Sequence, residues 1–150
     1  MEPVYFLIAL STLLFVGVIV ILHFEVFVWF SRQMERPGYP PRVRMVLLMF
    51  GILALHVVEI WLFAALVWFL LLFDGAGQIH AHYAVGFLDT VYLSAVTYTT
   101  VGYGDIWAEG PIRFVLGTEA LVGFALITWS ASLTFIEMQK HWLPKRSPME

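Results

Sequence analysis

The chain has 150 residues, of which 61% are hydrophobic and 13% charged, and its mean hydropathy is +0.84. A soluble domain of this size could not cover so much apolar surface, so the composition predicts a membrane protein. Eight Lys and Arg against eleven Asp and Glu give a net charge of -3, which argues against a basic nucleic-acid-binding face. The absence of cysteine excludes disulfides and thiolate metal sites.

Three apolar segments are long enough to cross a membrane, which takes about 20 helical residues. They are Val4 to Phe30, Val43 to Phe73 and Phe114 to Ile136. A fourth, Phe87 to Tyr98, would rise only about 18 Å as a helix, so it can enter the membrane but not cross it. The sequence therefore predicts an all-α membrane protein with three transmembrane helices and one re-entrant helix.

Basic residues predict the orientation of these segments. They gather after the first segment and after the third, at Arg32, Arg36, Arg42, Arg44, Lys140, Lys145 and Arg146. Because basic loops stay on the cytoplasmic side, we expect a multi-pass protein of the cell membrane with its N-terminus outside and its C-terminus cytoplasmic. This divides the chain into an N-terminal transmembrane helix (1–34), a cytoplasmic loop (35–42), a membrane domain (43–139) and a short cytoplasmic tail (140–150).

The stretch "TTVGYGD", residues 99–105, follows the re-entrant segment directly. Non-helical backbone at membrane depth persists only where protein buries it or where it lines a water-filled path. Glycine reaches positive φ at little cost, so Gly102 and Gly104 allow the peptides to turn until their carbonyls face one side. The plain alternative is a glycine turn in an external loop.

This stretch resembles the selectivity filter of the potassium channel family, in which four TVGYG loops form a ring of carbonyl oxygens. The likeness extends through "FLDTVYLSAVTYTTVGYGD" to the third span, so 43–139 is expected to be a pore domain and the complete channel a homotetramer. The resemblance implies that potassium binds at Thr100, Val101, Gly102 and Tyr103, that Gly104 completes the ion-binding loop, and that Thr99 lies at the cavity mouth. It also implies a flexible Gly123 in the inner helix, below which Phe135 is a candidate gate.

The resulting prediction is a potassium-selective channel, not an enzyme, that conducts K⁺ passively in the membrane lipid without a cofactor. A subunit of a potassium uptake transporter is the alternative, although the transporter families it would resemble carry four degenerate filter loops on one long chain. A membrane metalloenzyme is a third class, but the spacing of the His and Glu residues shows no convergent ligand set. No nucleic-acid partner is expected.

Three residues are expected to support the filter from outside it. Asp105 ends the loop, and the resemblance places Tyr92 where a pore-helix aromatic bonds this acid; the plain alternative is a solvated turn acid. Glu119 lies in the third span near the depth of the filter, where an ionisable group is costly and usually paired. It is either a brace for the pore helix, with Arg113 as a partner, or an interfacial acid.

His23, Glu25, His56 and Glu59 are the other unusual residues in the first two spans. His56 and Glu59 share a helix face, whereas His23 and Glu25 point about 160° apart, so at most three of the four converge easily. Two interpretations remain open. The group is a buried proton sensor that links the first helix to the pore, or it is a satisfied polar contact between two helices.

Overall fold

The computed structural model describes residues 3–34 and 40–142. The predicted loop at 35–42 and the predicted tail at 140–150 lie largely outside these ranges. Arg36, Lys145 and Arg146, on which part of the predicted orientation rests, also lie outside the described residues.

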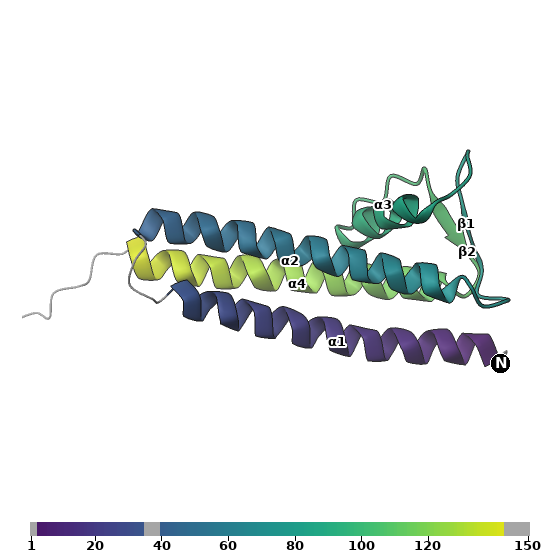
Figure 1. Ribbon diagram of the computed structural model, residues 1–150, viewed down its shortest axis with the longest axis horizontal. Helices are drawn as coiled ribbons and strands as arrows, with labels where there is room; N and C mark the ends of the chain where they lie inside the picture. The colour runs from purple at the N-terminus through teal and green to yellow at the C-terminus, as the bar shows by residue number, and fades with distance from the viewer. Residues whose placement is uncertain (1–2, 35–39, 143–150) are drawn as a thin grey trace, which may run out of the picture.

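Three long helices lie side by side along the molecule (Figure 1): α1 (Pro3–Met34), α2 (Pro41–Leu70) and α4 (Arg113–Trp142). Each contains a segment that is long and apolar enough to cross a membrane, which confirms the three predicted spans. The start of α2 is set by Pro40, which is extended, and by a proline in the first turn. A proline there lacks only an N–H that would have no helical partner, and its fixed φ suits the helix.

A short helix and a two-stranded sheet lie at one end of the bundle (Figure 1). The helix α3 (Phe87–Tyr98) has the bounds predicted for the re-entrant segment and packs against α2 and α4. The strand β1 (Gln78–His80) pairs antiparallel with β2 (Trp107–Glu109), with Ile79 opposite Ala108. These strands were not predicted, because three residues are too few to show an alternating pattern. Their pairing joins the two ends of the segment that contains α3 and the glycine loop.

The first helix packs on the rest of its own chain at three levels. Near the sheet, Ile8 joins α2 and α4 residues such as Val67 and Val115; halfway along, Ile19 joins Phe63 and Tyr98. At the far end Phe27 packs with Leu48 and Ile52 of α2. The sequence left open whether this helix packs on its own subunit, and in the structure it does.

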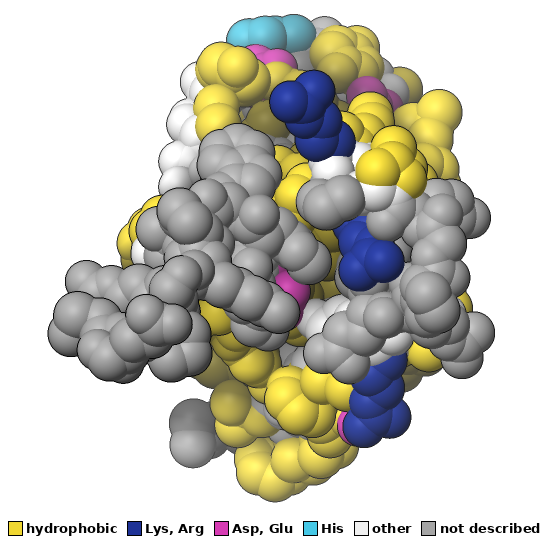
Figure 2. Space-filling view, turned by 90° about the vertical axis from the view of Figure 1, so that its left-hand side faces the viewer, with side chains coloured by type: hydrophobic (Ala, Val, Ile, Leu, Met, Phe, Trp, Pro, Cys, Tyr) yellow, Lys and Arg dark blue, Asp and Glu magenta, His cyan; other side chains and the backbone are white. Residues whose placement is uncertain are grey.

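The outer faces of the three long helices carry exposed apolar side chains along their lengths, as lipid-facing helices do. Figure 2 looks onto the end where α1 finishes and α2 begins, and basic side chains gather there. Arg32 is in the last turn of α1, and Arg42 and Arg44 are in the first turns of α2. This end is the one that the charge pattern predicts to be cytoplasmic.

Candidate functional site

The start of α3 is held by Asp89. Its Oδ2 accepts a hydrogen bond from the Gly86 backbone N–H at 2.7 Å, and its Oδ1 accepts one from the Tyr83 hydroxyl at 3.2 Å. A carboxylate in the first turn also interacts favourably with the positive end of the helix dipole. These bonds fix the start of α3, whose buried face packs on α2 and α4.

The candidate filter, residues 99–105, leaves α3 through a turn that is hydrogen-bonded back to the helix. The Thr99 N–H donates to the Ala95 carbonyl at 3.1 Å, and the Gly102 N–H donates to the Val96 carbonyl at 3.0 Å. Backbone φ is then positive at every second residue: 60° at Thr100, 51° at Gly102 and 78° at Gly104. Within the described residues, Thr100 is the sole non-glycine with positive φ. This conformation costs a β-branched residue about 1–2 kcal/mol, a form of strain that concentrates at functional sites.

The alternating sign of φ bears on what this backbone can do chemically. When residues of positive and negative φ alternate, successive peptides can present the same polar groups to one side. A column of carbonyl oxygens arranged in this way can replace the hydration shell of a cation. The alternation of φ in this loop is compatible with such a column.

A hollow of about 720 Å³ lies beside the loop. Thr100, Gly102 and Gly104 line it together with residues of α3, β2 and α4. The side chains of Val101 and Tyr103 are 52% and 74% exposed. A single chain therefore covers the loop only in part.

The last residue of the loop is tied to α3 by a hydrogen bond between a tyrosine and an acid. The Tyr92 hydroxyl lies 3.0 Å from Asp105 Oδ2 and 3.2 Å from Oδ1, and donates to this carboxylate. Both residues are exposed. Desolvation and the hydrogen bond to Asp105 raise the pKa of Tyr92 above its usual value, so the hydroxyl keeps its proton at neutral pH.

A family model described as "Ion channel" matches residues 55–140. The chain belongs to the ion channel family. The match begins within α2 and takes in α3, the loop, the sheet and nearly all of α4, whereas α1 lies outside it. Comparisons with curated proteins and with solved structures gave no match.

Glu119 is fully buried in α4 of this channel, where it meets α3. Ser94 of α3 donates its hydroxyl to Glu119 Oε1, and the same hydroxyl lies 2.8 Å from the Ile60 carbonyl of α2. The other oxygen, Oε2, has no hydrogen-bond partner within the described residues. The suggested partner Arg113 was wrong: it lines the hollow beside the loop, whereas Glu119 faces the serine of the re-entrant helix. A buried position also excludes the reading as an interfacial acid.

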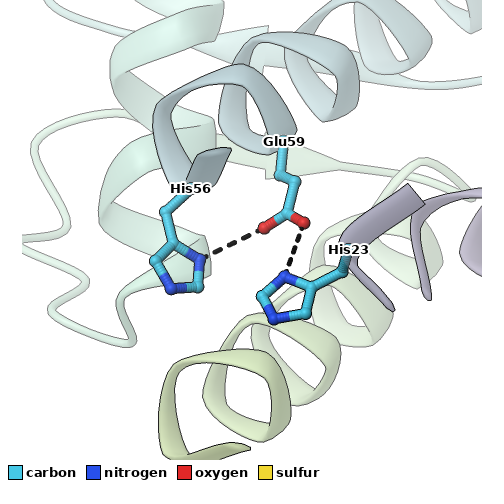
Figure 3. A group of neighbouring side chains, drawn as sticks. All are labelled: His23, His56 and Glu59. Carbon is cyan, nitrogen blue, oxygen red and sulfur yellow. Dashed lines mark hydrogen bonds and ion pairs between the residues drawn. The ribbon is translucent and has the colours of Figure 1, made fainter. Parts of the chain in front are cut away.

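A second polar group of the channel joins all four helices. His23 Nδ1 lies 2.9 Å from Glu59 Oε1, and His56 Nδ1 lies 3.1 Å from Oε2, so both rings face one carboxylate (Figure 3). The Tyr98 hydroxyl donates to Glu59 Oε2 at 2.5 Å, and Ser130 Oγ lies 3.0 Å from His23 Nε2. We call these five residues the buried cluster. Through Tyr98 it reaches the last residue of α3, next to Thr99 of the candidate filter.

Glu25 does not belong to the buried cluster, which corrects its place in the predicted buried group. Glu25 is exposed on α1, whereas His23 is fully buried. Two residues advance a helix by about 200°, so the two side chains leave α1 on nearly opposite sides. Whether His23, His56 and Glu59 sense protons stays a prediction.

Gly123 sits where α4 meets the end of α3. A Cβ atom at this position would lie 2.2 Å from the Tyr98 carbonyl oxygen, well inside contact distance. The structure therefore gives Gly123 a packing reason for being glycine, because only a residue without a side chain allows this approach. Its predicted flexibility stays a prediction, and so does the gate at Phe135, which is half-exposed near the far end of α4.

Sequence reasoning missed Tyr98 and Ser130 as partners of the buried histidines and Ser94 as the partner of Glu119. Glu59 and Glu119, as acidic residues at membrane depth, did signal that partners exist. The identity of the partner depends on how the helices are rotated against one another, and sequence spacing within one helix does not report that rotation.

Proposed function

We propose that this ion channel is selective for potassium and conducts it passively through a central pore formed by four copies of the chain. The observation that carries the proposal is the loop at residues 99–105, where the "TVGYG" sequence coincides with positive φ at every second residue. K⁺ would bind the carbonyl oxygens of Thr100, Val101, Gly102 and Tyr103. The Thr100 hydroxyl adds an inner oxygen, and Gly104 ends the series.

The tetramer follows from a count of loops. One chain supplies one loop, and a closed ring of carbonyls around a K⁺ ion needs four, related by cyclic symmetry. The exposed side chains of Val101 and Tyr103 and the hollow beside them support this assembly, since they offer a neighbouring subunit a surface to cover. In this arrangement α3 is the pore helix, α4 lines the pore, and α1 packs outside as an additional helix. Ion transport accounts for the family match without any enzyme activity.

Potassium flux into liposomes containing the purified protein tests this function. We expect K⁺ flux well above Na⁺ flux and block by Ba²⁺, together with a tetrameric mass in detergent. Equal K⁺ and Na⁺ fluxes would refute the selectivity, and a monomeric mass would refute the assembly. Flux that needs the gradient of a second solute would favour the transporter subunit instead.

A glycine substitution in the loop, compared with one in α1, tests whether the flux depends on the loop. A methyl group at Gly102 meets no atom within 4 Å of this chain, but φ is +51° there, a conformation that alanine rarely adopts. Gly102→Ala should therefore abolish selective flux through its backbone conformation. Gly17→Ala in α1 is the matched control, because its methyl group also meets nothing and its backbone is helical, so flux should be unchanged.

A further inference from the structure

The donor atoms of the buried cluster have the composition of a metal site. His23, His56 and Glu59 each offer one ligand atom, and these atoms all lie within 4.8 Å of one another. Two histidines and a glutamate are a ligand set that zinc enzymes use, with a water at the fourth position. In a tetrahedral site with bonds of about 2.1 Å, the ligand atoms lie about 3.4 Å apart. His23 Nδ1 lies 2.9 Å from Glu59 Oε1 and His56 Nδ1 lies 3.1 Å from Oε2, so each ring approaches its own carboxylate oxygen at a separation close to that value.

We propose that His23, His56 and Glu59 bind a divalent transition-metal ion of the Zn²⁺ type between α1 and α2. Both rings face the carboxylate with Nδ1 (Figure 3), so the ion binds between these atoms while each neutral imidazole carries its proton on Nε2. Because α1 lies outside the region matched by the family model, the ion fastens this additional helix to the pore domain.

The charge of the cluster favours a cation. The described partners of Glu59 are His23, His56 and Tyr98, and none of them carries a fixed positive charge. With both imidazoles neutral, one negative charge stays buried between apolar helices, and Glu59 is fully shielded from solvent. Burying an uncompensated charge is costly, so a bound cation relieves that cost.

The neighbours of the three ligands are those that a metal site requires. Ligating histidines usually donate their second ring N–H to an oxygen, and His23 Nε2 faces Ser130 Oγ at 3.0 Å. The carboxylate is oriented by the Tyr98 hydroxyl at 2.5 Å. These contacts fix the direction of one ring and of the carboxylate before any metal arrives.

The site also has an entry path. The side chain of His56 is 13% exposed, whereas His23 and Glu59 are fully buried. His56 and Ser130 line a hollow of about 360 Å³ between α2 and α4, together with apolar residues such as Ile127. An ion and its remaining water can reach the cluster through this hollow.

Calorimetric titration with ZnCl₂ tests the proposal on the full chain, purified without a polyhistidine tag and stripped with a chelator. We expect one Zn²⁺ per chain, binding at least 100-fold weaker in His56→Gln, and a 10- to 100-fold loss in Ser130→Ala, which removes a contact behind the ligand. The matched control is His80→Gln with His82→Gln, which removes the last residue of β1 and a histidine of the segment that follows it, and should leave the affinity unchanged. Binding that disappears in this control and persists in His56→Gln would overturn the proposal.

Co²⁺ in place of Zn²⁺ gives a readout that does not depend on a stable ligand variant. A four-coordinate nitrogen and oxygen site gives Co²⁺ an intense visible absorption, whereas an adventitious hydrated ion absorbs weakly. We expect the intense band in the parent protein and its loss in His23→Gln. If Zn²⁺ does not bind and the Co²⁺ band is absent, the cluster is only a hydrogen-bond network. Both measurements are independent of conduction, so the channel proposal stands or falls separately.

Discussion

Two tyrosines of α3 each donate a hydrogen bond to a carboxylate, in opposite surroundings. Tyr92 and Asp105 are exposed at the end of the candidate filter where Asp105 lies, whereas Tyr98 and Glu59 are completely buried behind the end where Thr99 begins. Water can replace the exposed bond when it breaks, but at the buried end only the other groups of the buried cluster, such as His56 Nδ1, lie within reach to replace it. The same chemical pair is therefore expected to tune the filter at one end and to stabilise the fold at the other.

The largest effect should come from Glu59→Ala in the presence of a chelator. This change removes the two carboxylate oxygens that His23, His56 and Tyr98 share as a partner. We expect a loss of about 3–5 kcal/mol, the usual cost of removing one partner from a buried polar group. Thermal unfolding in detergent measures the loss, and Glu25→Ala, which removes an exposed glutamate of α1, should leave the midpoint unchanged. A midpoint shift of equal size in Glu59→Ala and Glu25→Ala would contradict the expectation that the buried carboxylate stabilises the fold more than the exposed one.

An intermediate effect is expected from Gly123→Ala, which disturbs the buried end without removing a hydrogen bond. The new methyl group would overlap the Tyr98 carbonyl, so α4 must move away from α3. Overpacking of this kind costs about 1–3 kcal/mol. The same unfolding measurement should show the loss, with Gly17→Ala as the control. An unchanged midpoint together with altered channel opening would instead support the flexible role predicted for this glycine.

The smallest effect on stability, but a clear one on conduction, is expected from Tyr92→Phe. This change removes the exposed hydrogen bond to Asp105. We expect the unfolding midpoint to stay within error. Single-channel open times should shorten, because the end of the candidate filter near Asp105 is no longer tied to α3. Tyr83→Phe is the matched control, since this exposed tyrosine bonds Asp89 at the start of α3 instead of the loop. Open times that do not change in Tyr92→Phe would remove the coupling between this bond and the filter.

Much of the fold follows from patterns within single segments. The three spans were predicted from length and apolar content, and the bounds of α3 from a run too short to cross the membrane. The glycine loop was identified because its residues and its place after that run constrain the backbone locally. Segments shorter than any pattern, such as β1 and β2, and contacts across helices, such as Ser94 with Glu119, could not be found in this way.

By itself, the sequence determined the membrane class, the number of spans and the place of the glycine loop after α3, because hydropathy, helix length and glycine positions act within a few consecutive residues. Only the tertiary structure decided that Glu59 and not Glu25 faces His23, that Gly123 seats α4 on Tyr98, and that α1 packs on its own chain. These outcomes depend on how each helix is rotated about its axis and how far it is shifted along it. Packing among the four helices determines the rotation and the shift at the same time.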